Sequence, residues 1–173
     1  RSYLLLIEKP IINYLISKLD FYIVLTNQIN DYFKISSNKS ILIEGIFDYF
    51  GDLNDSSFVE KIKNKKIILY TGTVDERYGI RRLVDEFSSM ADPNFELHIC
   101  GGGPTVDYVK TMTIKNINIK YLGMKSQSEI AFLQKSADLL INPRDNVGDY
   151  NKYSFPSKLM EYMASGTPVL IYR

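Results

Sequence analysis

The chain has 173 residues, of which 45% are hydrophobic and 24% charged, enough apolar side chain to bury the core of an ordinary domain. Lys and Arg number 21 against 20 Asp and Glu, and the resulting net charge of +1 removes the usual electrostatic argument for nucleic-acid binding. Apolar runs fall short of the roughly 20 residues of a membrane span. One cysteine, Cys100, and one histidine, His98, argue against an internal disulfide and against a zinc site. The composition favours a cytoplasmic globular protein.

The two ends of the sequence predict a fragment of a longer protein. The chain begins at Arg1, without a methionine or a signal-like segment, and it stops in a strand pattern at residues 168–173. We therefore expect its activity to belong to the longer protein.

The first part of the chain predicts a few short elements. Helical spacing predicts a helix over residues 2–19, with Pro10 kinking or dividing it. A short buried strand is expected at 21–25, then a helix at 27–33 capped by Thr26, and a strand at 40–44. Polar residues 48–57 suggest a linker. The predicted domains are 1–50, the end of one domain; 51–64, a linker; and 65–173, the next domain.

From residue 65 onward a unit of strand, loop and helix repeats. Strands are predicted at 66–71, 96–100, 117–122, 138–142 and 168–172, and helices follow from residue 80, from 105 to about 111, at 129–136 and at 154–165. This alternation predicts an α/β fold, a Rossmann-like, doubly wound parallel sheet with helices on both faces. Because ligands of such sheets bind at the carboxyl ends of the strands, the informative loops begin at Gly72, Gly101, Gly123 and Asn142.

The helix predicted at 154–165 offers a phosphate site. Ser154 can cap it and Gly166 can end it, and the unpaired N–H groups of its first turn, with Lys158 nearby, suit phosphate oxygens. Glu161 lies on the same face and could accept hydrogen bonds from two ribose hydroxyls. The alternative is that Glu161 is solvated and forms an i,i+3 ion pair with Lys158.

The segment that contains this helix, KYSFPSKLMEYMASGTPV at 152–169, resembles the signature of glycosyltransferase family 4, the group 1 glycosyltransferases with the GT-B fold. The likeness extends to YTGTVDERYGI at 70–80, CGGGP at 100–104 and YLGM at 121–124, in the family's order. The resemblance implies that 65–173 is the C-terminal, donor-binding half of such an enzyme, incomplete at its C-terminus. Residues 1–50 then end the N-terminal, acceptor-binding domain.

The resemblance also implies roles for residues near this helix. Glu161 matches the second glutamate of the family's E-x7-E motif, which is implied to hold the donor ribose. Tyr153 stands in place of the first glutamate, which is implied to contact the sugar. The backbone of Ser157, Lys158 and Leu159 matches the stretch near the diphosphate.

In the first loop, Thr73 and Tyr78 occupy positions where many members carry an arginine and a lysine that reach the diphosphate. Arg77 is the nearest cation and can substitute for them, or it can be an exposed residue in the first turn of a helix. Arg144, at the end of a predicted strand, is a second candidate.

The glycines of the second loop are not a dinucleotide fingerprint, because Val106 and Lys120 stand where the third glycine and the acidic residue would be. In the resembled family the backbone of Gly101 and Gly102 approaches the donor; the alternative is a tight turn. Gly123 and Met124 match the loop that borders the base. The predicted substrate-binding residues are therefore Gly72, Thr73, Arg77, Gly101, Gly102, Gly123, Met124, Arg144, Ser154, Phe155, Ser157, Lys158, Leu159 and Glu161, with no catalytic residue and no metal ligand assigned.

The expected function is the donor domain of a retaining, metal-independent glycosyltransferase that uses a nucleoside-diphosphate sugar and no cofactor. The sequence contains no Asp-x-Asp, as suits an enzyme whose leaving diphosphate is stabilised by helix ends and basic residues. Uracil, guanine and adenine stay open as bases. A carbohydrate or lipid-linked acceptor is expected to bind the absent N-terminal domain, in polysaccharide biosynthesis, with the whole protein cytoplasmic or peripheral to the inner face of the membrane and this chain alone inactive.

Two alternatives belong to other classes. A sugar-nucleotide 2-epimerase would need acidic and histidine groups for proton transfer, whereas His98 is expected within a strand. A non-catalytic, receiver-like nucleotide-binding module would gather acidic residues at its strand ends, where this sequence has Gly72, Gly101, Gly123 and Arg144.

Overall fold

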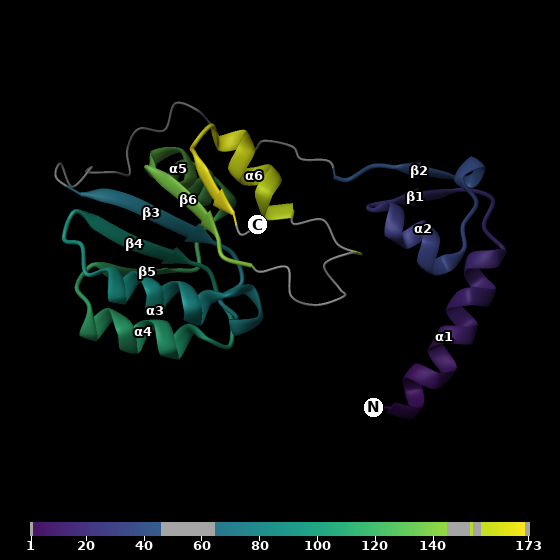
Figure 1. Ribbon diagram of the computed structural model, residues 1–173, viewed down its shortest axis with the longest axis horizontal. Helices are drawn as coiled ribbons and strands as arrows, with labels where there is room; N and C mark the ends of the chain where they lie inside the picture. Colours follow the sequence, from purple (N-terminus) through teal and green to yellow (C-terminus); the bar gives the residue numbers. More distant parts are fainter. Residues whose placement is uncertain (1, 46–64, 145–152, 154–156, 172–173) are drawn as a thin grey trace. The chain divides into compact units, whose positions relative to one another are not determined.

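A computed structural model describes residues 2–45, 65–144, 153 and 157–171 (Figure 1). These residues fall into two units, one with residues 2–45 and Tyr153, the other with residues 65–144 and 157–171. The predicted linker, 51–64, and the predicted helix start, Ser154 and Phe155, lie outside the described residues.

The first unit is small and has five elements in chain order: α1 (Ser2–Ser17), β1 (Tyr22–Val24), α2 (Asn27–Phe33), a 3₁₀ turn (Ser37–Lys39) and β2 (Ser40–Leu42). Pro10 lies inside α1 and does not divide the helix. The strands β1 and β2 are parallel, with Ile23 opposite Ile41. Thr26 caps α2 with an extended backbone and no side-chain hydrogen bond to the helix. Within the described residues, no helix is both long and apolar enough to cross a bilayer.

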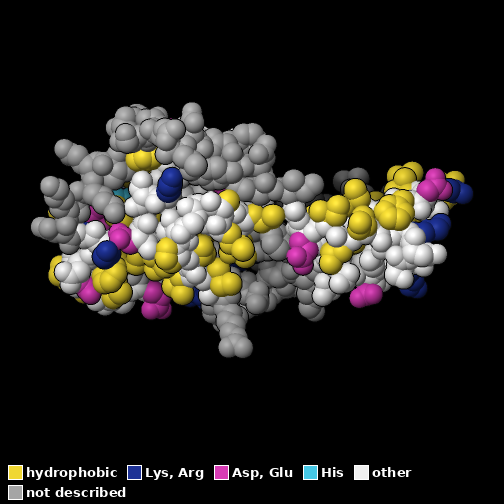
Figure 2. Space-filling view, turned by 90° about the horizontal axis from the view of Figure 1, so that it is seen from above, with side chains coloured by type: hydrophobic (Ala, Val, Ile, Leu, Met, Phe, Trp, Pro, Cys, Tyr) yellow, Lys and Arg dark blue, Asp and Glu magenta, His cyan; other side chains and the backbone are white. Residues whose placement is uncertain are grey.

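The expectation of a buried strand at 21–25 is wrong for most of its side chains. Val24 is buried, whereas Ile23 is 69% exposed and Phe21 and Leu25 are also exposed. Side chains alternate between the two faces of a strand, and α2 packs against β1. Figure 2 shows hydrophobic side chains at the surface of this unit.

The second unit is built on a five-stranded sheet with the strand order β5-β4-β3-β6-β7. All four neighbouring pairs are parallel, which confirms the predicted parallel sheet. In the central strand, Ile68 lies opposite Leu97 of β4 on one side and Leu139 of β6 on the other. The strands are β3 (Lys66–Thr71), β4 (Phe95–Cys100), β5 (Ile119–Gly123), β6 (Leu139–Asn142) and β7 (Val169–Ile171).

Helices cover both faces of this sheet, as predicted (Figure 1). The chain moves from β3 to β4 and β5 in one direction and then returns to β6 and β7 on the other side of β3. Right-handed crossovers therefore place the helices of the two halves on opposite faces. One face carries α3 (Ile80–Met90) and α4 (Val106–Lys115), and the other carries α5 (Gln127–Ser136) and α6 (Ser157–Ser165).

The α3 and α4 face holds the larger apolar core. The residues predicted to share one face of the first helix are all buried, and they pack with β4 and with Val109 of α4. Alternate side chains of β4 enter this core, because Leu97 and Ile99 point to this face of the sheet and are fully buried. The buried residues from α3 are Ile80, Leu83, Val84 and Phe87.

The α5 and α6 face combines a smaller apolar group with buried polar side chains. Leu69, Ala137, Leu140 and Tyr162 form the apolar group. The polar residues buried beside them are Thr71, Gln134, Ser165 and Thr167.

Some element boundaries differ from the prediction. The helix expected at 129–136 begins at Gln127, because Ser126 and Glu129 form a capping box. The Glu129 backbone N–H donates to Ser126 Oγ at 3.3 Å, and the Ser126 backbone N–H donates to Glu129 Oε2 at 2.8 Å. The strand expected from residue 117 begins at Ile119, and Ile117 is exposed.

Candidate functional site

The loops after β3, β4 and β5 lie side by side at the carboxyl edge of the sheet. The Gly72 N–H donates to the Cys100 carbonyl at 3.0 Å, and the Gly101 N–H donates to the Gly123 carbonyl at 2.8 Å. These bonds continue the strand pairing by one residue into the loops. They bring the predicted glycine loops together, as expected for the ligand edge of a parallel sheet.

Close backbone approach makes glycine necessary at the second loop. Gly101 has a φ of +139°, and a Cβ added there would lie 1.8 Å from the Gly72 carbonyl oxygen. A Cβ added at Gly102 would lie 3.2 Å from Sδ of Met124, whose side chain is 81% exposed. The second loop therefore lies against the first loop at Gly101 and against Met124 of the third loop at Gly102.

The helix α6 brings charged groups to the same edge. Ser157, Lys158, Leu159 and Glu161 all lie in it, and Cε of Lys158 lies 3.8 Å from the position of a Cβ added at Gly72. The Lys158 ammonium donates to both carboxylate oxygens of Glu161, at 3.0 Å and 2.8 Å. The i,i+3 ion pair considered as the alternative from the sequence is thus present, and it lies beside the first glycine loop.

A buried polar network fixes α6 to the end of β3. The Thr71 N–H donates to the Tyr162 hydroxyl at 2.9 Å, and that hydroxyl donates to the Thr71 carbonyl at 3.0 Å. The described register pairs β6 with β3 at Ile68 and Leu69, so Tyr162 supplies hydrogen bonds to Thr71 beyond the paired part. Burial raises the pKa of the Tyr162 phenol, and the group stays neutral and can both donate and accept.

Gln134 of α5 joins the same network. Its side-chain amide donates to Thr71 Oγ1 at 2.9 Å and lies 3.5 Å from Glu161 Oε2, while its backbone carbonyl accepts from the Thr167 hydroxyl at 2.7 Å. Sequence reasoning missed Thr71, Gln134 and Tyr162. One signal was available, because Gln134 lies one helical turn after the apolar Ile130 and three residues before the apolar Ala137 in the sequence.

The first loop presents Arg77 in a 3₁₀ turn, Glu76–Tyr78, rather than in the first turn of an α-helix. Asp75 Oδ1 accepts from the Arg77 backbone N–H at 2.9 Å, and Oδ2 accepts from the guanidinium at 2.6 Å. Hydrogen bonds from Arg77 hold the pKa of the Asp75 carboxyl below its usual range. The Arg77 guanidinium thus bonds to Asp75, although the Arg77 side chain is 78% exposed. Thr73 is held through its carbonyl, which accepts from the Tyr70 hydroxyl at 2.8 Å.

The two predicted arginines lie around one aromatic ring. Cζ of Arg77 is 6.0 Å and Cζ of Arg144 is 5.7 Å from the centroid of the Tyr78 ring, within the range of cation–π attraction. A Cβ added at Gly79 would lie 2.4 Å from the Pro143 carbonyl oxygen, so the loops after β3 and β6 meet there. The structure thus groups Arg77 and Arg144 around Tyr78, and Lys158 and Glu161 beside Gly72.

His98 lies within β4, as expected. Its Nε2 is 2.9 Å from Glu96 Oε2, and Lys65 Nζ is 3.6 Å from Glu96 Oε1. Burial raises the pKa of Glu96, but His98, Lys120 and Lys65 outweigh it and leave the pKa lowered. This geometry keeps His98 on the strand, away from the glycine loops, so it lends no support to an epimerase base. In the part of the chain that the structure describes, no three His, Cys, Asp or Glu side chains gather as a metal site would require.

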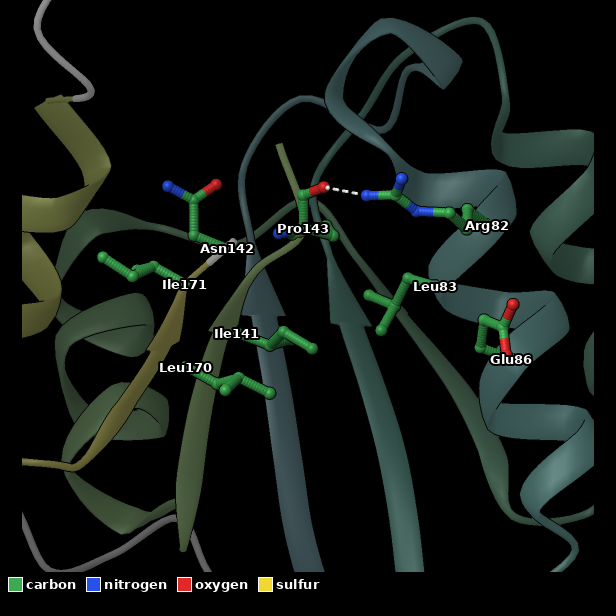
Figure 3. A pocket seen from close by; sticks show the side chains of 8 residues that line it. All are labelled: Arg82, Leu83, Glu86, Ile141, Asn142, Pro143, Leu170 and Ile171. Atoms are coloured by element: carbon green, nitrogen blue, oxygen red, sulfur yellow. Dashed lines mark hydrogen bonds between the residues drawn. The ribbon is translucent and has the colours of Figure 1, made fainter. Parts of the chain in front are cut away.

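A separate pocket of about 350 Å³ lies between α3 and the edge formed by β6 and β7 (Figure 3). Leu83, Ile141 and Leu170 line its apolar wall, and Arg82 donates to the Pro143 carbonyl at 3.2 Å at one end. None of the predicted substrate-binding residues lines this pocket. It opens on the α3 face of the sheet, whereas Lys158 and Glu161 belong to a helix of the opposite face.

Comparison with known families identifies the second unit. The family model described as "Glycosyl transferases group 1" matches residues 53–173. The chain belongs to the group 1 glycosyl transferases. The family resemblance expected from the four sequence segments is thereby confirmed at the level of group 1. No curated protein matches the chain.

Solved structures place this group 1 glycosyl transferase in the GT-B fold, as predicted. Sucrose-phosphate synthase from Thermosynechococcus elongatus superposes with a TM-score of 0.69 at 19% identity, over 92% of this chain and 42% of its own. HepE from Anabaena, in complex with UDP and glucose, gives 0.65 at 17%, over 88% and 44%. A TarM variant from S. aureus, in complex with fondaparinux, α-GlcNAc-glycerol and UDP, gives 0.64 at 16%, over 90% and 30%. The chain spans less than half of each.

Proposed function

We propose that residues 65–173 bind the donor of a retaining, metal-independent glycosyltransferase of family 4, a nucleoside-diphosphate sugar. The observation that carries the proposal is the placement of Lys158 and Glu161 beside Gly72. This position lies where the strand order reverses at β3, which is where α/β sheets bind nucleotides. The related HepE and TarM structures contain UDP, which supports a nucleotide donor here.

In this proposal the Lys158 ammonium binds the diphosphate. Its side chain is 41% exposed and lies against the Gly72 loop, where a phosphate can reach it. The bond between the anomeric carbon and the diphosphate oxygen breaks, and the diphosphate leaves with the bonding electrons. The anomeric carbon forms a bond to the oxygen of an acceptor hydroxyl, whose proton passes to the departing diphosphate. A fixed positive charge at the leaving group stabilises that developing charge, which is work that a metal ion performs in other transferases.

The Glu161 carboxylate accepts hydrogen bonds from the ribose hydroxyls in this proposal. A carboxylate has about four acceptor positions, so the contacts with Lys158 leave room for a diol. The glycine loops and Met124 border the base, and Arg77 and Arg144 approach the donor from the Tyr78 side. Asp75 Oδ2 accepts from Nε and Nη2 of Arg77 at 3.0 Å and 2.6 Å, which orients the guanidinium.

The proposal extends to the whole protein. A further domain, of which residues 1–50 are the end, holds a carbohydrate or lipid-linked acceptor, and the reaction contributes to polysaccharide biosynthesis without an organic cofactor. The protein acts in the cytoplasm, at the inner face of the membrane where the acceptor is lipid-linked. The small fraction of each related structure that this chain covers supports a second domain.

Calorimetric titration of the 173-residue chain with UDP, GDP, ADP and CMP tests the donor site. We expect one of them to bind selectively, and Glu161→Ala to weaken it more than about tenfold, because hydrogen bonds to a charged group are lost. The matched control is Glu86→Ala, an exposed glutamate that lines the pocket of Figure 3. Weaker binding in the control alone would move the nucleotide to that pocket, and no binding of any nucleotide would refute the donor site.

Transfer assays test the two-domain part of the proposal. We expect the 173-residue chain to bind its nucleotide and to show little or no transfer to added acceptors, because the acceptor must be held close to the anomeric carbon of the donor. Robust turnover by this chain would show that residues 65–173 suffice for both substrates.

A further inference from the structure

Glu161 has two kinds of neighbour, and they differ in exposure to solvent. On one side the Lys158 ammonium contacts both carboxylate oxygens, and its side chain is 41% exposed. On the other side the Gln134 amide nitrogen lies 3.5 Å from Oε2, and Gln134 is 2% exposed. The lysine is a long, hydrated side chain that can turn to another anion, whereas the glutamine is enclosed by packing.

The amide of Gln134 has a second hydrogen-bond partner. The same amide nitrogen donates to Thr71 Oγ1 at 2.9 Å, and Thr71 is fully buried and bonded through its backbone to Tyr162. Because Tyr162 follows Glu161 in α6, both partners of the glutamine belong to the joint between β3 and α6. The amide therefore links the end of the central strand to the carboxylate.

We propose that Gln134 is a positioning residue that keeps the Glu161 carboxylate directed to the ribose when Lys158 turns to the diphosphate. The inference rests on the proposed function, since it assigns the carboxylate to the ribose. A neutral amide suits this position because it donates a hydrogen bond to the carboxylate without competing for the charge of the diphosphate. The glutamine then contributes to ribose recognition from beneath the site, without contacting the donor.

The test compares ribose with 2′-deoxyribose in the nucleotide. Calorimetry measures the binding of UDP and 2′-deoxy-UDP, and of the corresponding guanine and adenine pairs, to the 173-residue chain. The dissociation constant of the deoxy form divided by that of the ribose form is a ratio that reports the hydroxyl contact. Gln134→Met keeps the length of the side chain and removes the amide. We expect this variant to reduce the ratio by about 2- to 10-fold, the range for one hydrogen bond, and to leave the affinity for inorganic diphosphate unchanged.

Two controls separate positioning from stability. Gln127→Met changes the same residue type at the exposed start of α5 and leaves the ratio unchanged. Thr71→Val removes the hydroxyl that anchors the glutamine and lowers the ratio in the same direction as Gln134→Met, while Thr71→Ser retains the hydroxyl and restores it. If Gln134→Met fails to fold, as judged by circular dichroism, the pair of Thr71 variants decides by the same criterion.

The outcomes distinguish this inference from the proposed function. If the unmodified chain prefers UDP and Glu161→Ala abolishes that preference while Gln134→Met and Thr71→Val retain it, the positioning role is overturned and the donor site stands. If the unmodified chain binds no nucleotide, or binds ribose and deoxyribose forms equally, the proposed role of Glu161 fails and the inference falls with it.

Discussion

The two faces of the sheet are stabilised in different ways around the same strands. On the α3 and α4 face, β4 contributes Leu97 and Ile99, which are fully buried among aliphatic and aromatic side chains. On the α5 and α6 face, β3 ends in Thr71, which is equally buried but bonded to Tyr162 and Gln134. One face is held by apolar packing, and the other by hydrogen bonds with a defined direction.

This difference indicates that the two faces of the sheet contribute differently to stability and to binding. Apolar packing is roughly proportional to buried area and tolerates small shifts, whereas a hydrogen bond fixes the distance and direction of its partners. Two of the residues proposed to contact the donor, Lys158 and Glu161, belong to the face with the polar network. We therefore expect mutations on the first face to act mainly on stability, and mutations on the second to act also on binding.

The largest effect on stability is expected for Leu97→Ala. This substitution leaves a cavity in the apolar core of the α3 and α4 face and lowers the free energy of unfolding by about 2–5 kcal/mol. Urea unfolding at equilibrium measures the change. If the α3 and α4 face acts mainly on stability, the folded variant binds nucleotide as the unmodified chain does. A large loss of nucleotide affinity would contradict this expectation.

A smaller effect is expected for Tyr162→Phe. The substitution preserves the ring and leaves the N–H and carbonyl of Thr71 without their partner, which costs about 1–3 kcal/mol. The matched control is Tyr108→Phe, whose hydroxyl bonds to Asp85 on the exposed surface of the other face. We expect the control to change the unfolding free energy by less than about 0.5 kcal/mol. Equal losses of unfolding free energy in the two variants would show that the buried Tyr162 hydroxyl contributes no more to stability than the exposed Tyr108 hydroxyl.

The capping box at the start of α5 gives a pH-dependent contribution. Ser126→Ala is expected to lower the unfolding free energy by about 1 kcal/mol, with exposed Ser89→Ala of α3 as the control.

Hydrogen bonds from Ser126, together with Lys125, lower the pKa of Glu129 to about 2 from 4.5. Because this pKa is lowered in the folded state, the stabilisation is complete above 4.5 and is lost as the pH falls toward 2. Acid titration of the unfolding free energy of Glu129→Gln against the unmodified chain checks this, and a difference that is unchanged at pH 2 would contradict it.

The smallest effect on stability is expected for Lys158→Ala. The variant loses a partly exposed i,i+3 ion pair with Glu161, and such pairs contribute only about 0.2–0.5 kcal/mol. In the proposed site it also loses the cation that binds the diphosphate, so its affinity for inorganic diphosphate falls more than about tenfold. Lys125→Ala, which loses a surface ion pair with Glu129, is the control for both measurements. Unchanged diphosphate affinity in Lys158→Ala would remove this lysine from the site.

Much of the second unit could be predicted from local patterns. The strand at 66–71 and the apolar face of α3 follow from periodicity, and the glycine loops follow from their position after each strand. The first unit was less predictable, because a short apolar strand such as β1 gives no indication of which of its faces is covered. Within the site, the ion pair between Lys158 and Glu161 follows from their spacing in one helix.

The sequence by itself determined the fold class, the family and the loops that form the ligand edge, since these depend on the order and period of residues along the chain. The tertiary structure alone decided that Arg144 lies beside the Tyr78 ring, where Arg77 also lies. It alone also brought Thr71, Gln134 and Glu161 into one network, from a strand and two helices. These contacts join residues distant in the sequence, and their geometry is set by how the helices pack on the sheet, which no local pattern specifies.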